Sequence, residues 1–279
     1  MRKYLKQLYN LIGAYFIYEQ LRKNFENAMT KYLFDRSTTY YDNNEPSKVY
    51  KSIIQGSDYR YDSFFAALLK NDDNGSVYLP KKINIISWNY DFQLEVSYLN
   101  FLVDSLGLDE VQKNLNIYPN PLNSELEERS SIIKINGTAG FYDDKKKYGE
   151  LFDFKKHSLD DESMKLLKKI LFQKDNYKHL IYFAWNNDHI TDKARTYARG
   201  IINNTDVLVV IGYSFPYFNR DTDRHIFESL GNTRGVKTYI QTTSNAFESI
   251  KKRAIGVNQS FRNAEAFTEL DQFLIPNEL

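Results

Sequence analysis

The stretch "LVVIGYSFPYFNRDTDRHIF" at 208–227 joins an apolar run to a polar, aromatic loop and then to a charged segment. The apolar run contains several β-branched residues, which predicts a buried strand, and the charged segment predicts a helix. Polar residues directly after such a strand have two explanations: helix capping and turn formation, or a ligand. The residues in question are Gly212, Tyr213, Ser214, Asn219, Asp221 and Asp223.

The same strand–helix unit recurs along the chain. Short strands that are buried on both faces and alternate with helices are typical of a parallel sheet with helical crossovers. We therefore expect an α/β fold, with a Rossmann-like parallel sheet of about five strands, helices on both faces and an N-terminal helical segment. The predicted strands are 81–87, 131–135, 179–184, 206–212 and 236–241, and the predicted helices are 92–106, 192–203, 220–230 and 245–254.

The pattern also predicts the domain organisation. Apolar residues at helical intervals predict helices within 1–36, 47–55 and 61–71, with a loop at 37–48 and a turn at 71–76. We expect residues 1–80 to form a helical segment and residues 81–279 to form the Rossmann-type domain. The charged stretch "DDKKKYGELFDFKKHS" at 143–158 predicts an insertion near 140–160.

Composition excludes several classes of function. The 279 residues include 37 basic and 36 acidic ones, a net charge of +1, so nucleic acid and an anionic membrane are not expected partners. The chain has no cysteine, which excludes disulfides, thiolate metal sites and a cysteine nucleophile. Its four histidines lack ligand spacing, so no metal is expected. Without a signal peptide or a long apolar run, the expected location is cytoplasmic.

Polar residues follow every predicted strand. In open parallel sheets, ligands bind outside the carboxyl ends of the strands. Any one of these groups is explained by capping or a turn, but five groups on one edge favour a polar nucleotide cleft. The groups lie at 88–91, 136–138, 185–188, 212–214 and 241–245.

Four of these segments resemble sirtuin-like proteins. "INIISWNYDFQLE" at 83–95 resembles their strand–Asn-x-Asp–helix element, and "IIKINGTAGFY" at 132–142 resembles their next strand, with Asn136 in place of a histidine. "DVLVVIGYSFPYFNRDTD" at 206–223 resembles their Gly-(Thr/Tyr)-Ser segment, and "TYIQTTSN" at 238–245 the strand near the adenosine ribose. The resemblance covers about residues 81–260 and is strongest to bacterial sirtuin-like domains that consume NAD in anti-phage defence.

The resemblance implies that NAD is the substrate or ligand and that no metal is needed. It implies that Asn89 orients the attacking water or the ribose hydroxyls, and that Asp91 stabilises positive charge as the nicotinamide–ribose bond breaks. The residues implied as catalytic are Asn89, Asp91 and Asn136, and those implied as cofactor-binding are Gly212, Tyr213, Ser214, Thr242 and Asp223.

Two features depart from the family. The Gly-Ala-Gly-x-Ser phosphate loop is absent, because "LIGAYF" at 11–16 carries Tyr15 where the second glycine belongs. This suggests a chain that starts after the phosphate-loop strand. The family's histidine, a general base, is Asn136 here, and loss of such a group costs about 10²–10⁴ in rate.

Three functional hypotheses remain open. The first is an NAD glycohydrolase, and the second is a degenerate domain that binds NAD or ADP-ribose without turnover. The third is a structural or interaction module, and a homo-oligomer or a missing N-terminal segment or partner chain is a further expectation. Protein deacylation is disfavoured because the zinc-binding cysteines are absent, and a dehydrogenase because no G-x-G-x-x-G occurs.

Overall fold

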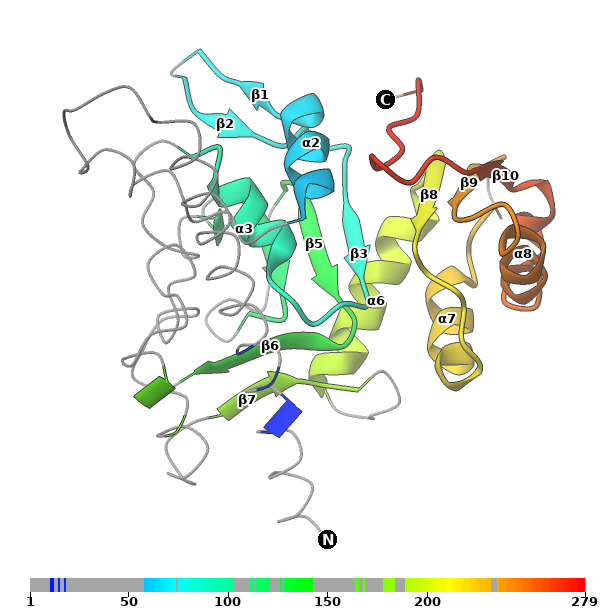
Figure 1. The fold of residues 1–279 in the computed structure, drawn as a ribbon. Helices are drawn as coiled ribbons and strands as arrows, with labels where there is room; N and C mark the ends of the chain where they lie inside the picture. The colour runs from blue at the N-terminus through cyan, green and yellow to red at the C-terminus, as the bar shows by residue number, and fades with distance from the viewer. Residues whose placement is uncertain are drawn as a thin grey trace, which may run out of the picture.

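The computed structural model describes a mixed α/β protein (Figure 1). The predicted helix at 47–55, the loop at 37–48, the insertion at 143–158 and the strand end at 185–188 lie outside the described residues. Of the predicted 1–36 helices, four positions are described, and all four are helical. The structure describes residues 11, 12, 15, 18, 58–73, 75–102, 111, 112, 114–120, 126, 128–142, 164, 165, 168, 178–183, 189–231 and 235–278.

Two parallel sheets of three strands each form the centre of the described fold. The first has the order β3-β5-β4, from β3 (Ile85–Ser87), β5 (Ser131–Lys134) and β4 (Asn116–Tyr118). The second has the order β10-β9-β8, from β10 (Glu265–Phe267), β9 (Lys237–Gln241) and β8 (Val207–Ile211). The prediction of parallel pairing is therefore confirmed. The prediction of one sheet of about five strands is wrong for the described strands, which form two separate parallel sheets.

The predicted strand at 179–184 is a strand, but it belongs to neither parallel sheet. It is β7 (Lys178–Ile181), and it pairs antiparallel with β6 (Gly137–Tyr142). The chain turns directly after β5 because Gly137 adopts a φ of +73°. A Cβ at this position would lie 2.0 Å from the carbonyl oxygen of Leu180, so only glycine permits this pairing.

Helices α6 (His189–Asn203), α7 (Arg220–Phe227) and α8 (Phe247–Ile255) pack around the second sheet. In α6, Ala194, Ala198 and Ile202 are buried at four-residue intervals, the spacing of one helix face. Their hydrophobic cluster includes residues of both β5 and β8, so α6 packs against both parallel sheets. Short 3₁₀ helices η2 (Tyr217–Asn219) and η3 (Gln259–Asn263) complete this half.

Helix α2 (Tyr59–Leu68) packs on α3 (Gln93–Leu99), beside the first sheet. The rings of Phe65 and Tyr98 meet edge to face, with centroids 5.5 Å apart. The helix predicted at 61–71 ends at Leu68, and the chain continues into the hairpin of β1 (Lys70–Asn71) and β2 (Val77–Tyr78). The predicted turn at 71–76 connects these two strands.

Candidate functional site

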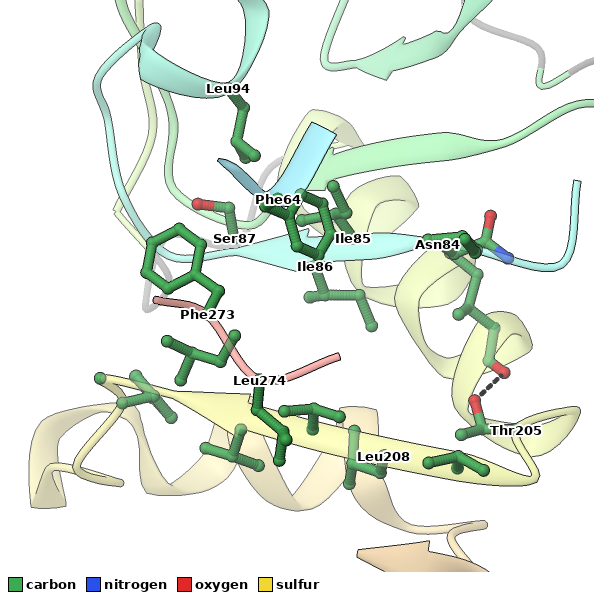
Figure 2. Close-up of a pocket in the computed structure, with 18 of the residues that line it drawn as sticks. Phe64, Asn84, Ile85, Ile86, Ser87, Leu94, Thr205, Leu208, Phe273 and Leu274 are labelled. Carbon is green, nitrogen blue, oxygen red and sulfur yellow. Dashed lines mark hydrogen bonds between the residues drawn. The ribbon is translucent and has the colours of Figure 1, made fainter. Parts of the chain in front are cut away.

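A pocket of about 450 Å³ lies between β3 and β8 (Figure 2). From this pocket the first sheet extends through β5 to β4, and the second extends in the other direction through β9 to β10. The order of strands therefore reverses at the pocket, and in doubly wound α/β proteins ligands bind where this happens. Asn89, Gly212 and Tyr213 are the predicted site residues that line it.

An aromatic stack joins the carboxyl ends of β3 and β8. Trp88 follows β3, Tyr213 follows β8, and their rings stack with centroids 4.3 Å apart and planes 24° apart. The ring of Phe227, on α7, lies parallel to the ring of Trp88, with 6.3 Å between the ring centroids. Gly212 turns the chain between strand and tyrosine with a φ of +64°. A Cβ on Gly212 would meet no atom within 4 Å, so the backbone is open to a ligand here.

Asn136, which follows β5, lies beside the Trp88–Tyr213 stack. Its side chain is 8% exposed, and Nδ2 donates to the carbonyl oxygen of Trp88 at 2.9 Å. Its Oδ1 is buried, as is the indole N–H of Trp88, and neither has a hydrogen-bond partner among the described residues. Since buried polar atoms are nearly always hydrogen-bonded, these two atoms favour a further partner at the site.

The hydroxyl of Tyr213 is hydrogen-bonded to the buried side chain of Asp223, on α7. The Tyr213 hydroxyl donates to Asp223, with distances of 2.8 Å to Oδ1 and 3.0 Å to Oδ2, and Asn219 Nδ2 donates to the hydroxyl at 3.1 Å. Burial raises the pKa of Asp223 to about 7, against the opposing effects of the Tyr213 hydrogen bond and the Arg220 charge. Burial and the Asp223 carboxylate raise the Tyr213 pKa far above its ordinary value.

The hydrogen bonds among Tyr213, Asp223 and Asn219 distinguish between helix capping and a site contact for Asn219. It stands at the N-cap position of α7 but makes no side-chain capping hydrogen bond. Its Nδ2 is used for Tyr213, and its Oδ1 is buried without a partner in the described part of the chain. Capping therefore does not explain Asn219.

Asn89 and Asp91, which both follow β3, have different surroundings. Asn89 is exposed at the pocket, and its backbone N–H donates to Ser87 Oγ at 3.1 Å. Asp91 is not among the pocket-lining residues, and its Oδ1 accepts from the backbone N–H of Gln93 at 3.1 Å, an Asx turn leading into α3. Tyr61 lies near both: burial raises its pKa to about 12, the Asp91 charge adds to this, and the Asn89 hydrogen bond opposes it.

Ser214 and Thr242 are not pocket-lining residues. The carbonyl oxygen of Ser214 accepts from Arg253 Nε on α8 at 2.7 Å. The backbone N–H of Thr242 donates to the carbonyl oxygen of Phe267, the last residue of β10, at 3.0 Å. These contacts connect the ends of β8 and β9 to neighbouring elements rather than to the pocket.

A buried ion pair beside the site was not predicted. Lys134, in β5, is 1% exposed, and its Nζ lies 2.7 Å from Glu95 Oε1 on α3. The same Nζ donates to the carbonyl oxygen of Asp91 and lies 5.1 Å from the ring centroid of Phe92. The pair thereby positions the segment between β3 and α3. The sequence signal was a lysine within an apolar strand, a position that requires a buried partner.

Tyr61 entered the site without any prediction, whereas Trp88 and Asn219 had been noted at the predicted strand ends but given no role toward the ligand. Among the residues that the structure describes, no group of three or more His, Cys, Asp and Glu could hold a metal ion. No helix in the described ranges is long and apolar enough to cross a membrane. Comparison of the chain with protein-family models, curated proteins and solved structures finds no match.

Proposed function

We propose that this chain binds NAD or a closely related nucleotide where the carboxyl ends of β3, β5 and β8 meet. The observation that carries the proposal is the group of buried, unpartnered polar atoms around the Trp88–Tyr213 stack. These are the indole N–H of Trp88 and the amide oxygens of Asn136 and Asn219. The choice of NAD among nucleotides rests on the resemblance to sirtuin-like proteins alone.

The chemistry of these groups suits a planar ligand with an amide. The indole N–H is a donor and the two asparagine oxygens are acceptors, and a carboxamide such as that of nicotinamide carries both kinds of group. All three atoms are buried, and only Trp88 lines the pocket, so a ligand would reach them after neighbouring side chains move. The open backbone at Gly212 leaves room for a sugar or phosphate to approach. Nucleotide at this position would also occupy the point where the strand order reverses.

If the protein turns NAD over, the reaction is hydrolysis of the nicotinamide–ribose bond. Asn89, exposed at the pocket, would orient the water or the ribose hydroxyls. Asp91 would act through its negative charge near Asn89 and Tyr61, since its Oδ1 already serves the turn into α3. An anti-phage role would then consist of depleting the NAD of an infected bacterial cell.

Binding without turnover is the second candidate function. Asn136 stands where the family has its general base, and an amide does not accept a proton at neutral pH. Its Nδ2 is engaged by the carbonyl oxygen of Trp88. This contact supports a structural and ligand-orienting use of Asn136 rather than proton transfer.

Two measurements on the purified protein test both candidates. NAD is incubated with the protein, and nicotinamide is quantified by liquid chromatography; steady release identifies a glycohydrolase. Melting curves are then recorded with NAD and with ADP-ribose. A rise in melting temperature without nicotinamide release identifies a binding protein. If the protein neither releases nicotinamide nor shows a rise in melting temperature with NAD or ADP-ribose, the proposal is overturned.

Asn89→Ala tests whether the pocket is the binding site. We expect about tenfold weaker binding, the value of one hydrogen bond to ligand. The loss of the Asn89–Tyr61 hydrogen bond should lower the free energy of unfolding by no more than about 1 kcal/mol, because Asn89 is exposed. The matched control is Ser214→Ala, also exposed and also implied by the resemblance, but not a pocket-lining residue. Equal losses in both variants would show that the ligand binds elsewhere.

A further inference from the structure

Two arginines lie against the loop that follows β8. Arg253, on α8, donates from Nε to the carbonyl oxygen of Ser214 at 2.7 Å. Arg220, the first residue of α7, donates from Nη1 to the carbonyl oxygen of Arg253 at 3.3 Å. Ser214 directly follows Tyr213, which lines the pocket, so the Cα atoms of these two residues are about 3.8 Å apart. We call Arg220 and Arg253 the arginine pair, and it lies beside the proposed nucleotide site.

The arginine pair has no carboxylate bound to it. Both residues are half-buried, an environment in which a cation is normally paired. Neither forms an ion pair in the part of the chain that the structure describes. Burial raises the pKa of Asp223 against the effect of the Arg220 charge, but both oxygens of Asp223 accept from Tyr213 and not from Arg220. The pair therefore carries positive charge that no ion pair within the described ranges neutralises.

Contacts with the protein use few donors of the arginine pair. A guanidinium carries five N–H groups. Arg220 uses one of them on the last turn of α8, and Arg253 uses one on the loop after β8. Among the described residues, Nη2 of Arg220 and both Nη groups of Arg253 have no acceptor. The contact of Arg253 with the loop is exposed to solvent, so its guanidinium is open to a ligand.

Tyr217 and Gly256 fix the orientation of Arg220. The Cζ atom of Arg220 lies 4.9 Å from the ring centroid of Tyr217, a residue that is 82% exposed. A guanidinium that stacks on an aromatic ring keeps its edge, with the N–H groups, for an anion. A Cβ on Gly256 would lie 2.5 Å from Nη1 of Arg220, although the φ of −68° at this residue suits any amino acid. The glycine therefore provides the space that the guanidinium occupies.

We infer that the arginine pair binds the diphosphate of a dinucleotide, an inference that rests on the proposed function of the adjoining pocket. A diphosphate is an anion, and the planar edge of a guanidinium matches two phosphate oxygens. The sequence contains no Gly-Ala-Gly-x-Ser segment, whose backbone N–H groups would bind a diphosphate. The arginine pair supplies donors and positive charge from α7 and α8 instead.

Calorimetric titration of the full chain tests this assignment with ADP-ribose and with adenosine, which has no phosphate. Arg253→Gln and Arg220→Gln should each weaken ADP-ribose binding at least about tenfold, the effect of losing a hydrogen bond between charged groups. Adenosine binding should change by less than about twofold, since the arginine pair faces the phosphates alone. ADP-ribose binding without any measurable adenosine binding in the unmodified protein would also support the inference.

Two neighbouring cations provide matched controls. Lys252 follows the same helix as Arg253 and is exposed, and Arg224 is exposed on the same helix as Arg220. Lys252→Gln and Arg224→Gln should change ADP-ribose binding by less than about twofold in 0.15 M salt, because exposed charges at a distance are screened.

Gly256→Ala tests the geometry while both arginines remain. The added Cβ should displace Nη1 of Arg220, so ADP-ribose binding should weaken severalfold while adenosine binding is unchanged. The helical backbone at this residue accommodates alanine, so the protein should stay folded even if the loss of the Arg253–Ser214 contact disrupts the loop in Arg253→Gln. Gly200→Ala, on α6, is the control, because a Cβ there meets no atom within 4 Å.

The inference is overturned if both glutamine variants bind ADP-ribose with unchanged affinity. It is also overturned if they lose adenosine and ADP-ribose equally, which would show that the arginine pair only holds the loop. Inorganic pyrophosphate separates this inference from the proposed function. Pyrophosphate binding that requires both arginines, without binding of NAD or ADP-ribose, would support the arginine pair as a diphosphate site and overturn the nucleotide function. If the unmodified protein binds none of these probes, both are overturned.

Discussion

The indole of Trp88 stacks on the phenol of Tyr213 with 4.3 Å between ring centroids, although the two residues follow strands of different sheets. The same indole lies parallel to Phe227, and its residue accepts the Asn136 hydrogen bond through its carbonyl oxygen. Trp88 is therefore one point, besides the packing of α6, at which the first sheet, the second sheet and α7 are joined. Both the stability of the protein and the proposed ligand site depend on it.

Replacing Trp88 should separate these two dependences. Trp88→Ala removes the stack and should lower the free energy of unfolding by about 3 kcal/mol. Trp88→Phe keeps a ring against Tyr213 but removes the indole N–H, so it should cost about 1 kcal/mol while still weakening the proposed binding of NAD. Urea unfolding and ligand titration measure the two effects. An alanine variant as stable as the unmodified protein would show that the stack does not join the sheets.

The raised pKa of Asp223 makes stability depend on pH. The pKa is about 7 in the folded protein against an ordinary value of 3.8, so folding favours the protonated carboxyl. Its stabilising contribution is fully present below about pH 4 and is lost as the pH rises toward 7, at up to about 1.4 kcal/mol per pH unit. Asp223→Asn should flatten this dependence in urea unfolding measured between pH 4 and 8.

Asp221→Asn provides the matched control for that series. Asp221 lies on the same helix but is exposed, so its removal should leave the slope of stability against pH unchanged. If Asp223→Asn retains the full slope, the carboxyl group responsible lies elsewhere in the protein.

The buried Lys134–Glu95 pair should respond differently to single and double substitution. Lys134→Met or Glu95→Gln alone leaves a buried group without its partner and should cost about 3–5 kcal/mol in the free energy of unfolding. Lys134→Met with Glu95→Leu removes both charges and should recover most of that loss. A double-mutant cycle by urea unfolding measures the coupling. Purely additive losses would contradict a coupled pair.

Two glycines with positive φ should tolerate alanine very differently. At Gly212 a Cβ meets open space, so Gly212→Ala should cost only the backbone term of about 1–2 kcal/mol. At Gly137 a Cβ would overlap the carbonyl oxygen of Leu180, so Gly137→Ala should cost about 3–5 kcal/mol. Thermal unfolding ranks the variants. A Gly212→Ala variant that is stable yet loses NAD binding would support backbone approach by the ligand.

Local sequence patterns predicted most of the central strands. Apolar runs bounded by turn residues located β5, β8 and β9 to within one residue at each end, because such runs reflect burial at each position. The run at 81–87 located the end of β3 but began four residues before Ile85. The strands β4 and β10 were not predicted, since runs of three residues are too short to show a period. Parallel pairing followed from the alternation of strands with helices, and that expectation was confirmed for both sheets.

The polar residues at the strand ends were visible in the sequence, but their use was not. Asn219 and Asp223 read equally well as helix-capping residues, and only the fold brings Tyr213 between them. Asp91, which the resemblance implies as a catalytic residue beside Asn89, uses its Oδ1 in the turn into α3.

The amino-acid order therefore establishes which segments are strands, which strand ends are polar and which chemistries are excluded by composition, since these depend on residues close together in the chain. The division into two sheets, the convergence on Trp88 and the pocket between β3 and β8 depend on which buried edges lie side by side. An apolar run predicts that a strand is buried, but it does not predict which strand it pairs with. The pairing depends on packing over the whole chain.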